Sequence, residues 1–170
     1  MPFTPYHFGP SGFFGLTLRK WLDIPVFVLA NVIVDIEVLV IMLFSFGWPK
    51  HRYCHTLLIG AAVGALWGLA AYPLRNIFKK LMKLFRVPYE TGLRKMVISG
   101  ILGVWLHNLI DGVYHFDVNL LWPFKTVSLY YIFHDRLGNE RIKIICLIFF
   151  LAALVPYFFA VRSYSKKHRI

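Results

Sequence analysis

Three ionisable side chains recur every four residues in one apolar stretch of this sequence, WLHNLIDGVYHFD (105–117). His107, Asp111 and His115 are spaced i, i+4 and i+8, which places them on one stripe of a helix. Neutral imidazole and carboxylate groups at such spacing are a frequent ligand set for divalent metal ions. A lone histidine in an apolar helix more often makes a polar contact between helices, but three ionisable groups on one stripe favour a metal site. Asp117 follows directly and could ligate the ion, orient a histidine or act as a general base.

Two further histidines open another apolar run, KHRYCHTLLIG (50–60). His51 and His55 are again four residues apart, so they also share a helical face. A membrane interface tolerates histidine, so this pair alone fits an interfacial position as well as it fits a metal site. Arg52 is suited to hold an anionic group such as phosphate, and Thr56 could bond a ligand or bind substrate.

Two carboxylates lie in the middle of a third apolar run, at Asp35 and Glu37 in NVIVDIEVLV (31–40). A charge at that depth costs about 2.5–3.5 kcal/mol on insertion scales, which is difficult to explain by packing alone. A structural ion pair is the alternative, but the basic residues all lie at the ends of apolar runs. Residues two apart on a helix do not face the same way. We therefore expect Asp35 to point at the site and Glu37 to support it or to serve as a general base.

The composition is that of an integral membrane protein. Of the 170 residues, 58% are hydrophobic and only 16% are charged, against about a quarter charged in soluble domains. A soluble domain of this length could not bury so much apolar surface.

The net charge of +11 is carried by clusters that flank the apolar runs. Such clusters are typical of loops held at the cytoplasmic leaflet by anionic lipid. We therefore expect membrane lipids as partners and no nucleic acid. The clusters are RNIFKKLMKLFR (75–86), LRK (93–95) and RSYSKKHRI (162–170).

Four apolar runs are long enough to cross a bilayer, which takes about 20 residues. No internal repeat or low-complexity linker divides the chain, so residues 1–170 are expected to form one domain. The predicted fold is an all-α membrane protein, a bundle of about four transmembrane helices. The expected spans are Ile24–Trp48, Thr56–Ile77, Met96–His115 and Ile144–Val161.

Two shorter helices are expected beside these spans. Residues 75–87 alternate apolar and basic side chains at helical spacing, which is typical of a helix lying on the membrane surface; a simple extension of the second span is the alternative. Residues 7–20 are too short to span and are predicted to form a re-entrant half-helix. At about 1.5 Å per residue, such a half-helix brings His7 to the depth of Asp35.

The distribution of Lys and Arg predicts the orientation. The basic connection 74–95 and the tail after Val161 should both be cytoplasmic. His51 and His55 then lie toward the extracytoplasmic face. By simple helical rise His55 would lie nearer the surface than His7 by about 10 Å or more, so either the 49–55 loop folds inward or the site is elongated and holds more than one ion.

Five motifs occur in the order found in a family of small integral-membrane proteins of bacteria and archaea described as metal-dependent hydrolases. Here they read FTPYHFGP, VDIE, HRYCHTLL, LHNLIDGVYH and LLWPF, within residues 1–125. The chain resembles this inner-membrane family with its His/Asp motifs. Two positions depart from the family pattern: Glu37 stands where members have a second aspartate, and Leu106 where they have Ser or Thr.

The resemblance implies a prokaryotic cytoplasmic (inner) membrane location and a metal site. Two further residues, His115 and Asp117, match a continuation of the last His/Asp motif in some members. The positions that carry over as metal ligands are His7, Asp35, His51, His55, His107 and Asp111.

The leading functional hypothesis is a membrane-embedded metal-dependent hydrolase with its site near the extracytoplasmic face. One or two divalent ions are expected, zinc fitting the ligands best and manganese or iron next. Glu37 or Asp117 could be the general base, with Arg52 and Thr56 binding a substrate. The substrate would be a lipid or another membrane-associated (phospho)ester, because a soluble substrate needs no buried site.

Two other functions remain open. Intramembrane Asp, Glu and His also build ion or proton relays, so a transporter is the main alternative; four spans without repeats and a one-sided polar cluster weigh against it. The second alternative is a non-catalytic scaffold that a closed metal site stabilises. The sequence leaves open whether the chain forms a homo-oligomer.

Overall fold

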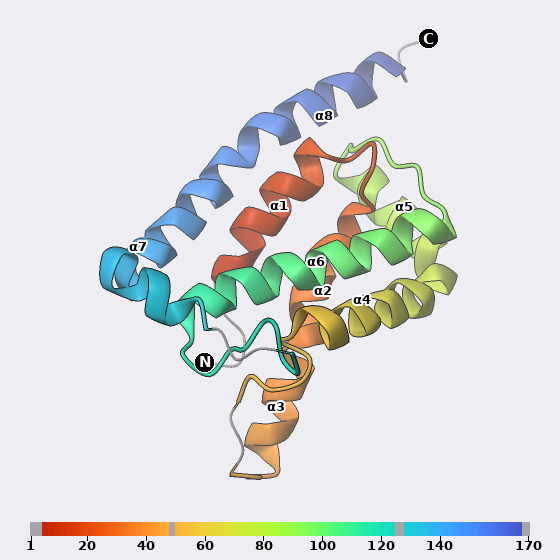
Figure 1. The fold of residues 1–170 in the computed structure, drawn as a ribbon. Coiled ribbons are helices and arrows are strands. Elements are labelled where there is room, and N and C mark those ends of the chain that lie inside the picture. The colour runs from red at the N-terminus through yellow and green to blue at the C-terminus, as the bar shows by residue number, and fades with distance from the viewer. Residues whose placement is uncertain (1–4, 48–49, 125–127, 168–170) are drawn as a thin grey trace.

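The computed structural model describes residues 5–47, 50–124 and 128–167, and within these ranges the chain is all-α with no strand (Figure 1). Two short 3-10 helices, η1 and η2, accompany eight α-helices. The elements in order are η1 (Pro5–His7), α1 (Phe8–Thr17), α2 (Ile24–Val34), α3 (Ile36–Leu43), α4 (Leu57–Ala71), η2 (Tyr72–Leu74), α5 (Arg75–Leu84), α6 (Leu93–Tyr114), α7 (Tyr130–Ala152) and α8 (Leu154–Lys167).

Four helical stretches are long and apolar enough to cross a membrane, which fits a multi-pass membrane protein and the predicted fold class. The last stretch extends beyond the expected run at both ends, because α7 begins well before Ile144 and α8 continues as helix through the basic tail. Inside α7, Gly138 has a non-helical backbone with φ 62°. The stretches are Ile24–Leu43, Leu57–Leu84, Leu93–Tyr114 and Leu137–Lys166.

α4 and α6 pack against each other more extensively than any other pair of described helices, and glycine makes the contact possible. A Cβ atom on Gly64 would lie 2.5 Å from the carbonyl oxygen of Gly100, and one on Gly100 would clash with the carbonyl oxygen of Gly64. Small residues four apart let two membrane helices touch through their backbones. Gly60, Gly64 and Gly68 give α4 such a face, and all three are buried. This contact fixes the beginning of α4 beside the second half of α6.

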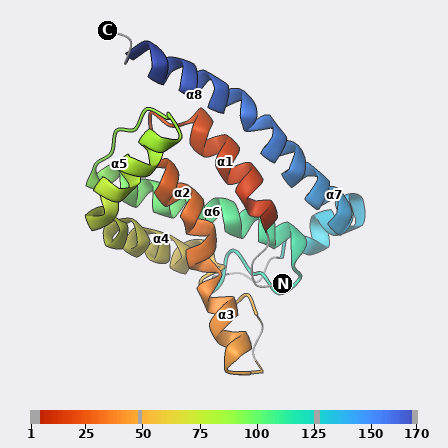
Figure 2. The same cartoon turned by 180° about the vertical axis from the view of Figure 1, so that it is seen from behind.

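The expected first span is interrupted at Asp35, where α2 ends and α3 begins. Beyond that break α3 projects away from the other helices (Figures 1 and 2). Before α2, Asp23 caps the helix by accepting the N–H of Val26 at 3.2 Å. Asp35 therefore lies at a helix junction, where its side chain can reach α6.

The expected half-helix 7–20 appears as α1, preceded by η1, which ends at His7. α1 packs against α2 and α7 and returns toward α2 through residues 18–23. The surface helix expected over 75–87 ends earlier, at Leu84, and η2 separates it from α4. Both views show α5 leaving the direction of α4 (Figures 1 and 2). How deep α1 and α5 lie in a bilayer remains a prediction.

Candidate metal centre

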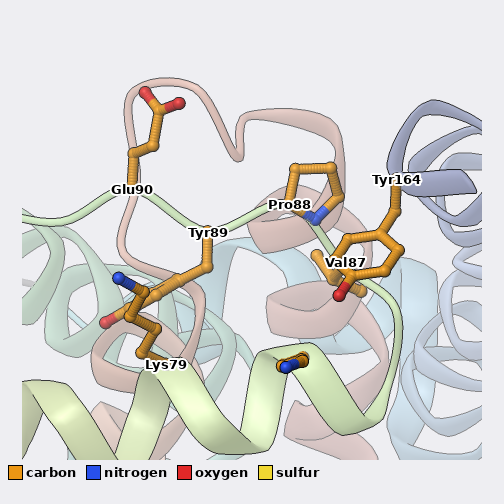
Figure 3. Close-up of a pocket in the computed structure, with 7 residues that line it drawn as sticks. Lys79, Val87, Pro88, Tyr89, Glu90 and Tyr164 are labelled. Carbon is orange, nitrogen blue, oxygen red and sulfur yellow. The ribbon is translucent and has the colours of Figure 1, made fainter. Parts of the chain in front are cut away.

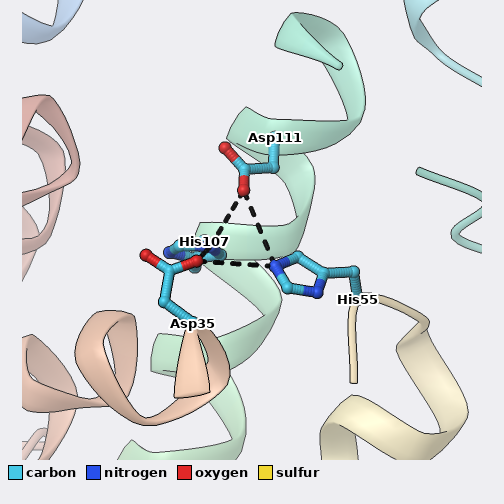
Figure 4. Close-up of side chains that lie close together, drawn as sticks. All are labelled: Asp35, His55, His107 and Asp111. Atoms are coloured by element: carbon cyan, nitrogen blue, oxygen red, sulfur yellow. Dashed lines mark ion pairs between the residues drawn. The ribbon is translucent and has the colours of Figure 1, made fainter. Parts of the chain in front are cut away.

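Four buried side chains from three parts of the chain converge on one point (Figure 4). Asp35 comes from the α2–α3 junction, His55 from the loop before α4, and His107 and Asp111 from successive turns of α6. Each offers one ligand atom, and the four atoms lie within 4.8 Å of one another. The predicted i, i+4 stripe on α6 therefore meets both of the other predicted motifs.

The separations match those expected around a metal ion. The Nε2 atom of His107 lies 3.0 Å from Asp111 Oδ2 and 3.4 Å from Asp35 Oδ1. The Nε2 atom of His55 lies 3.7 Å from each of the same two oxygens. Ligand atoms about 2.0–2.1 Å from a tetrahedral zinc ion are about 3.3 Å apart. A His₂Asp₂ set of this size fits zinc or a similar divalent ion.

These side chains are almost fully enclosed, with exposed fractions of 0% for His55 and His107 and 2% for Asp111. Several of their polar atoms lack a hydrogen-bond partner of normal geometry: Nε2 of His55, both ring nitrogens of His107 and Oδ1 of Asp111. Buried polar atoms are normally satisfied, and an ion is one explanation when they are not. The orphaned atoms therefore support a metal site.

Glu37 contacts the Nδ1 atom of His55, the ring nitrogen that faces away from the other three ligands. Its Oε2 atom lies 3.2 Å from His55 Nδ1 and accepts the N–H of Cys54 at 3.0 Å, while Oε1 accepts the N–H of Tyr53 at 2.8 Å. A carboxylate on the second nitrogen of a ligating histidine fixes its tautomer and ring orientation. Burial lowers the pKa of His55, but the bonds to Asp35 and Glu37 outweigh it and raise that pKa. Glu37, predicted as a candidate base, thus has the contacts of a positioning residue.

His7 and His51 extend the cluster around Asp111. His7 Nε2 lies 2.9 Å from Asp111 Oδ1, and the His7 ring stacks on that of His107 with centroids 4.3 Å apart. His51 Nε2 lies 3.7 Å from Asp111 Oδ2. His51 Nδ1 faces Asp117 Oδ1 at 3.0 Å, which repeats the carboxylate-on-histidine arrangement of Glu37 and His55.

A second group of ligand types lies next to the first and consists of His51, His115 and Asp117. His115 Nε2 is 4.0 Å from Asp111 Oδ1, so Asp111 lies between the two groups. Burial lowers the pKa of His115 to about 4. Burial raises the pKa of Asp117, but the hydrogen bond from His51 outweighs it and brings that pKa to about 2. At neutral pH both are in the protonation state that a metal requires.

A hollow of about 180 Å³ opens beside the second group. Arg52 lines it, with its guanidinium 4.6 Å from the centre of the Tyr53 ring. Thr56 does not line it, because its hydroxyl donates to Tyr53 O at 2.9 Å and caps α4 by accepting the N–H of Ile59 at 3.2 Å. The lining residues are His51, Arg52, Tyr53, Asp117, Asn119 and Trp122.

The sequence analysis missed three polar or aromatic residues of this region. Asn108 donates to the carbonyl oxygens of Cys54 and Thr56 at 3.0 and 3.1 Å and so ties the 54–56 loop to α6. The sequence feature that could have identified Asn108 is a polar amide inside an apolar helix, directly after His107. Asn119 and Trp122 line the hollow, and nothing in their spacing distinguishes them from ordinary loop residues.

All seven predicted ligands therefore lie in one connected network, with Glu37 and Asp117 behind two of the histidines. No family model, curated protein or solved structure matches the chain. The resemblance to membrane metal-dependent hydrolases stays a prediction, and the metal centre stands on its geometry. The seven are His7, Asp35, His51, His55, His107, Asp111 and His115.

Proposed function

We propose that this protein is a membrane-embedded metal-dependent hydrolase. The observation that carries the proposal is that the buried His₂Asp₂ group is joined through His51, which lies 3.7 Å from Asp111 Oδ2, to a hollow lined by His51 and Asp117. An ion held beside His51 would keep a coordination position free for water, as catalytic sites do. A structural ion would need the ligands but not the hollow. A resident zinc, manganese or iron ion would supply a Lewis acid and acidify a bound water.

Some residues of the site would bind the ion, and others orient the histidines that bind it. Asp35, His55, His107 and Asp111 hold the ion, and the second group gives room for another. Glu37 keeps the His55 ring turned toward the centre. Asp117 does the same for His51, and because it also lines the hollow it is the better placed of the two acids to accept a proton from a nucleophile.

The substrate we infer is amphiphilic, a lipid or another membrane-associated (phospho)ester. Arg52 and Tyr53 line the polar hollow and also a second, apolar cavity of about 340 Å³ between the loop and α3. An anionic headgroup beside Arg52 would thus have an apolar cavity next to it for a chain. The apolar part of this second cavity is formed by Ile33, Ile36, Val40, Ile41 and Phe46.

The Lys and Arg distribution supports a site toward the extracytoplasmic face and a cytoplasmic C-terminus. The prokaryotic inner membrane is proposed from the resemblance to the membrane hydrolase family. Whether the chain acts as a homo-oligomer is open in this proposal.

Elemental analysis of the detergent-purified protein, together with hydrolysis of a phospholipid and phosphomonoester panel, tests the proposal. Wild type should contain metal and hydrolyse at least one substrate, and Asp35→Asn should lose both. Val34→Ala is the matched control, because Val34 is fully buried beside Asp35 but offers no ligand atom. Metal without hydrolysis would favour the scaffold. Ion or proton flux in vesicles that Asp35→Asn abolishes would favour a transporter.

A further inference from the structure

A further hollow, lined by both apolar and charged side chains, lies at the junction of α5, the connection after it and α8, on elements that contribute nothing to the metal centre (Figure 3). Its volume is about 440 Å³. From these residues we propose that the hollow binds the headgroup of an anionic phospholipid. The lining residues are Lys79, Lys83, Val87, Pro88, Tyr89, Glu90 and Tyr164.

The walls of this hollow are fixed by specific contacts. α5 ends in a tight turn in which the Arg86 N–H donates to Lys83 O at 3.0 Å and the Val87 N–H donates to Met82 O at 2.9 Å. Arg86 takes the left-handed conformation with φ 55°, which usually favours glycine. The turn buries Val87, which is 3% exposed, and sends the chain back along α5.

Two phenols hold the other walls. Tyr157 of α8 donates its hydroxyl to Phe85 O at 3.1 Å, which ties α8 to the end of α5. Tyr89 donates its hydroxyl to Asp23 Oδ2 at 2.6 Å, and Asp23 is fully buried. A cavity whose walls are tied on both sides is already shaped for a ligand, so little ordering is needed on binding.

The charge in the hollow is positive. Lys79 and Lys83 are one turn apart on the same side of α5, and no carboxylate of the described chain forms an ion pair with either. Glu90 also lines the hollow, but Figure 3 shows its carboxylate directed away from α5, whereas Lys79 rises from α5 toward Tyr89. Two ammonium groups in one hollow suit a phosphate.

The rest of α5 explains why the phosphate should belong to a lipid. Phe78 and Met82 pack into the bundle, while Ile77 and Leu84 are 60% and 76% exposed. A helix that exposes apolar side chains such as Ile77 and Leu84 on one side and lysines on another lies at the boundary of acyl chains and headgroups. The hollow then opens at headgroup depth, where anionic lipid draws lysine.

Lipid binding to the full-length protein in detergent tests the proposal, using native mass spectrometry with phosphatidylglycerol or phosphatidylcholine at equal concentrations. Wild type should retain phosphatidylglycerol preferentially. Each of Lys79→Gln and Lys83→Gln should weaken its binding about fivefold, and the double variant about 25-fold.

Lys80→Gln is the matched control, because Lys80 lies on the same helix, about 100° round from Lys79 and about 60° from Lys83, and does not line the hollow. It should change the affinity by less than about twofold. An equal loss in Lys80→Gln would overturn the proposal in favour of general surface charge, as would equal retention of the two lipids by wild type. Inorganic phosphate should not displace the lipid; displacement at equal concentration would show a site for free phosphate instead.

Discussion

Glu37 Oε2 lies 3.2 Å from His55 Nδ1, so one carboxylate from α3 supports a histidine 18 residues further along the chain. The same carboxylate accepts the backbone N–H groups of Tyr53 and Cys54. The loop before α4 is thus folded inward around an acidic side chain, and its histidine reaches Asp35 and Asp111 as a result.

Replacing Glu37 should weaken metal binding without removing a ligand. We expect Glu37→Gln to lower zinc affinity about 10–100-fold, as loss of an outer carboxylate on a ligating histidine does. Competition with a chromophoric chelator measures the affinity. Glu140→Gln is the control, since the Glu140 side chain is 80% exposed and pairs only with Lys143 among the described residues. Wild-type affinity in Glu37→Gln would contradict the positioning role.

The sequence predicted the helices well, because apolar length is a local property, and the i, i+4 spacing placed His107 and Asp111 together on α6. The helical face expected for His51 and His55 is wrong, because both lie in the loop before α4, which begins only at Leu57. The sequence did not predict the helix break at Asp35, which lies inside one unbroken apolar run. Nor did it decide between an inward loop and an elongated site. The structure shows the loop folded inward, held by Glu37 and Asn108. Those contacts join residues 17 and 54 apart, for which one sequence contains no periodic signal.

Removing the metal should destabilise the fold. A ligand that binds only the native state at about 100 times its Kd adds about 2.7 kcal/mol. We therefore expect a chelator to lower the Tm of the metal-loaded protein, measured by circular dichroism in detergent. Asp111→Asn should show no such chelator effect, because Asp111 is a ligand of the first group and lies beside His115 of the second.

The control for that experiment is Val104→Ala. Val104 is fully buried on α6, one turn before His107, and offers no ligand atom. The variant should be less stable with and without metal, yet keep the full chelator-induced fall in Tm. A chelator effect retained in Asp111→Asn would place the ion elsewhere.

His115 should make the metal-free protein sensitive to acid. Burial lowers its pKa from 6.5 to about 4 in the folded protein. Between those values the unfolded chain binds a proton that the folded chain does not, so stability falls as the pH drops from 6.5 to 4. In His115→Gln that contribution disappears. With chelator present, the fall in Tm over this interval should be smaller in the variant than in wild type, and equal falls would contradict the assigned pKa.

The backbone contact between α4 and α6 should tolerate no added methyl group. In Gly64→Ala the new Cβ would meet Gly100 O at 2.5 Å, and backbone cannot move aside as a flexible side chain can. We expect a loss of about 1–3 kcal/mol in unfolding free energy, as in other overpacked contacts. Denaturation in mixed micelles measures it.

Gly12→Ala is the matched control, because Gly12 lies within α1 and a Cβ there would meet nothing within 4 Å. Alanine in a helix interior is about 0.5–1 kcal/mol better than glycine, so this variant should be slightly more stable than wild type. The pair also separates packing from function. Because α4 and α6 carry the loop of His55 against His107, Gly64→Ala should weaken metal binding, whereas Gly12→Ala should leave it unchanged. Equal metal affinity in both variants would mean that Glu37 and Asn108 alone hold the loop in place.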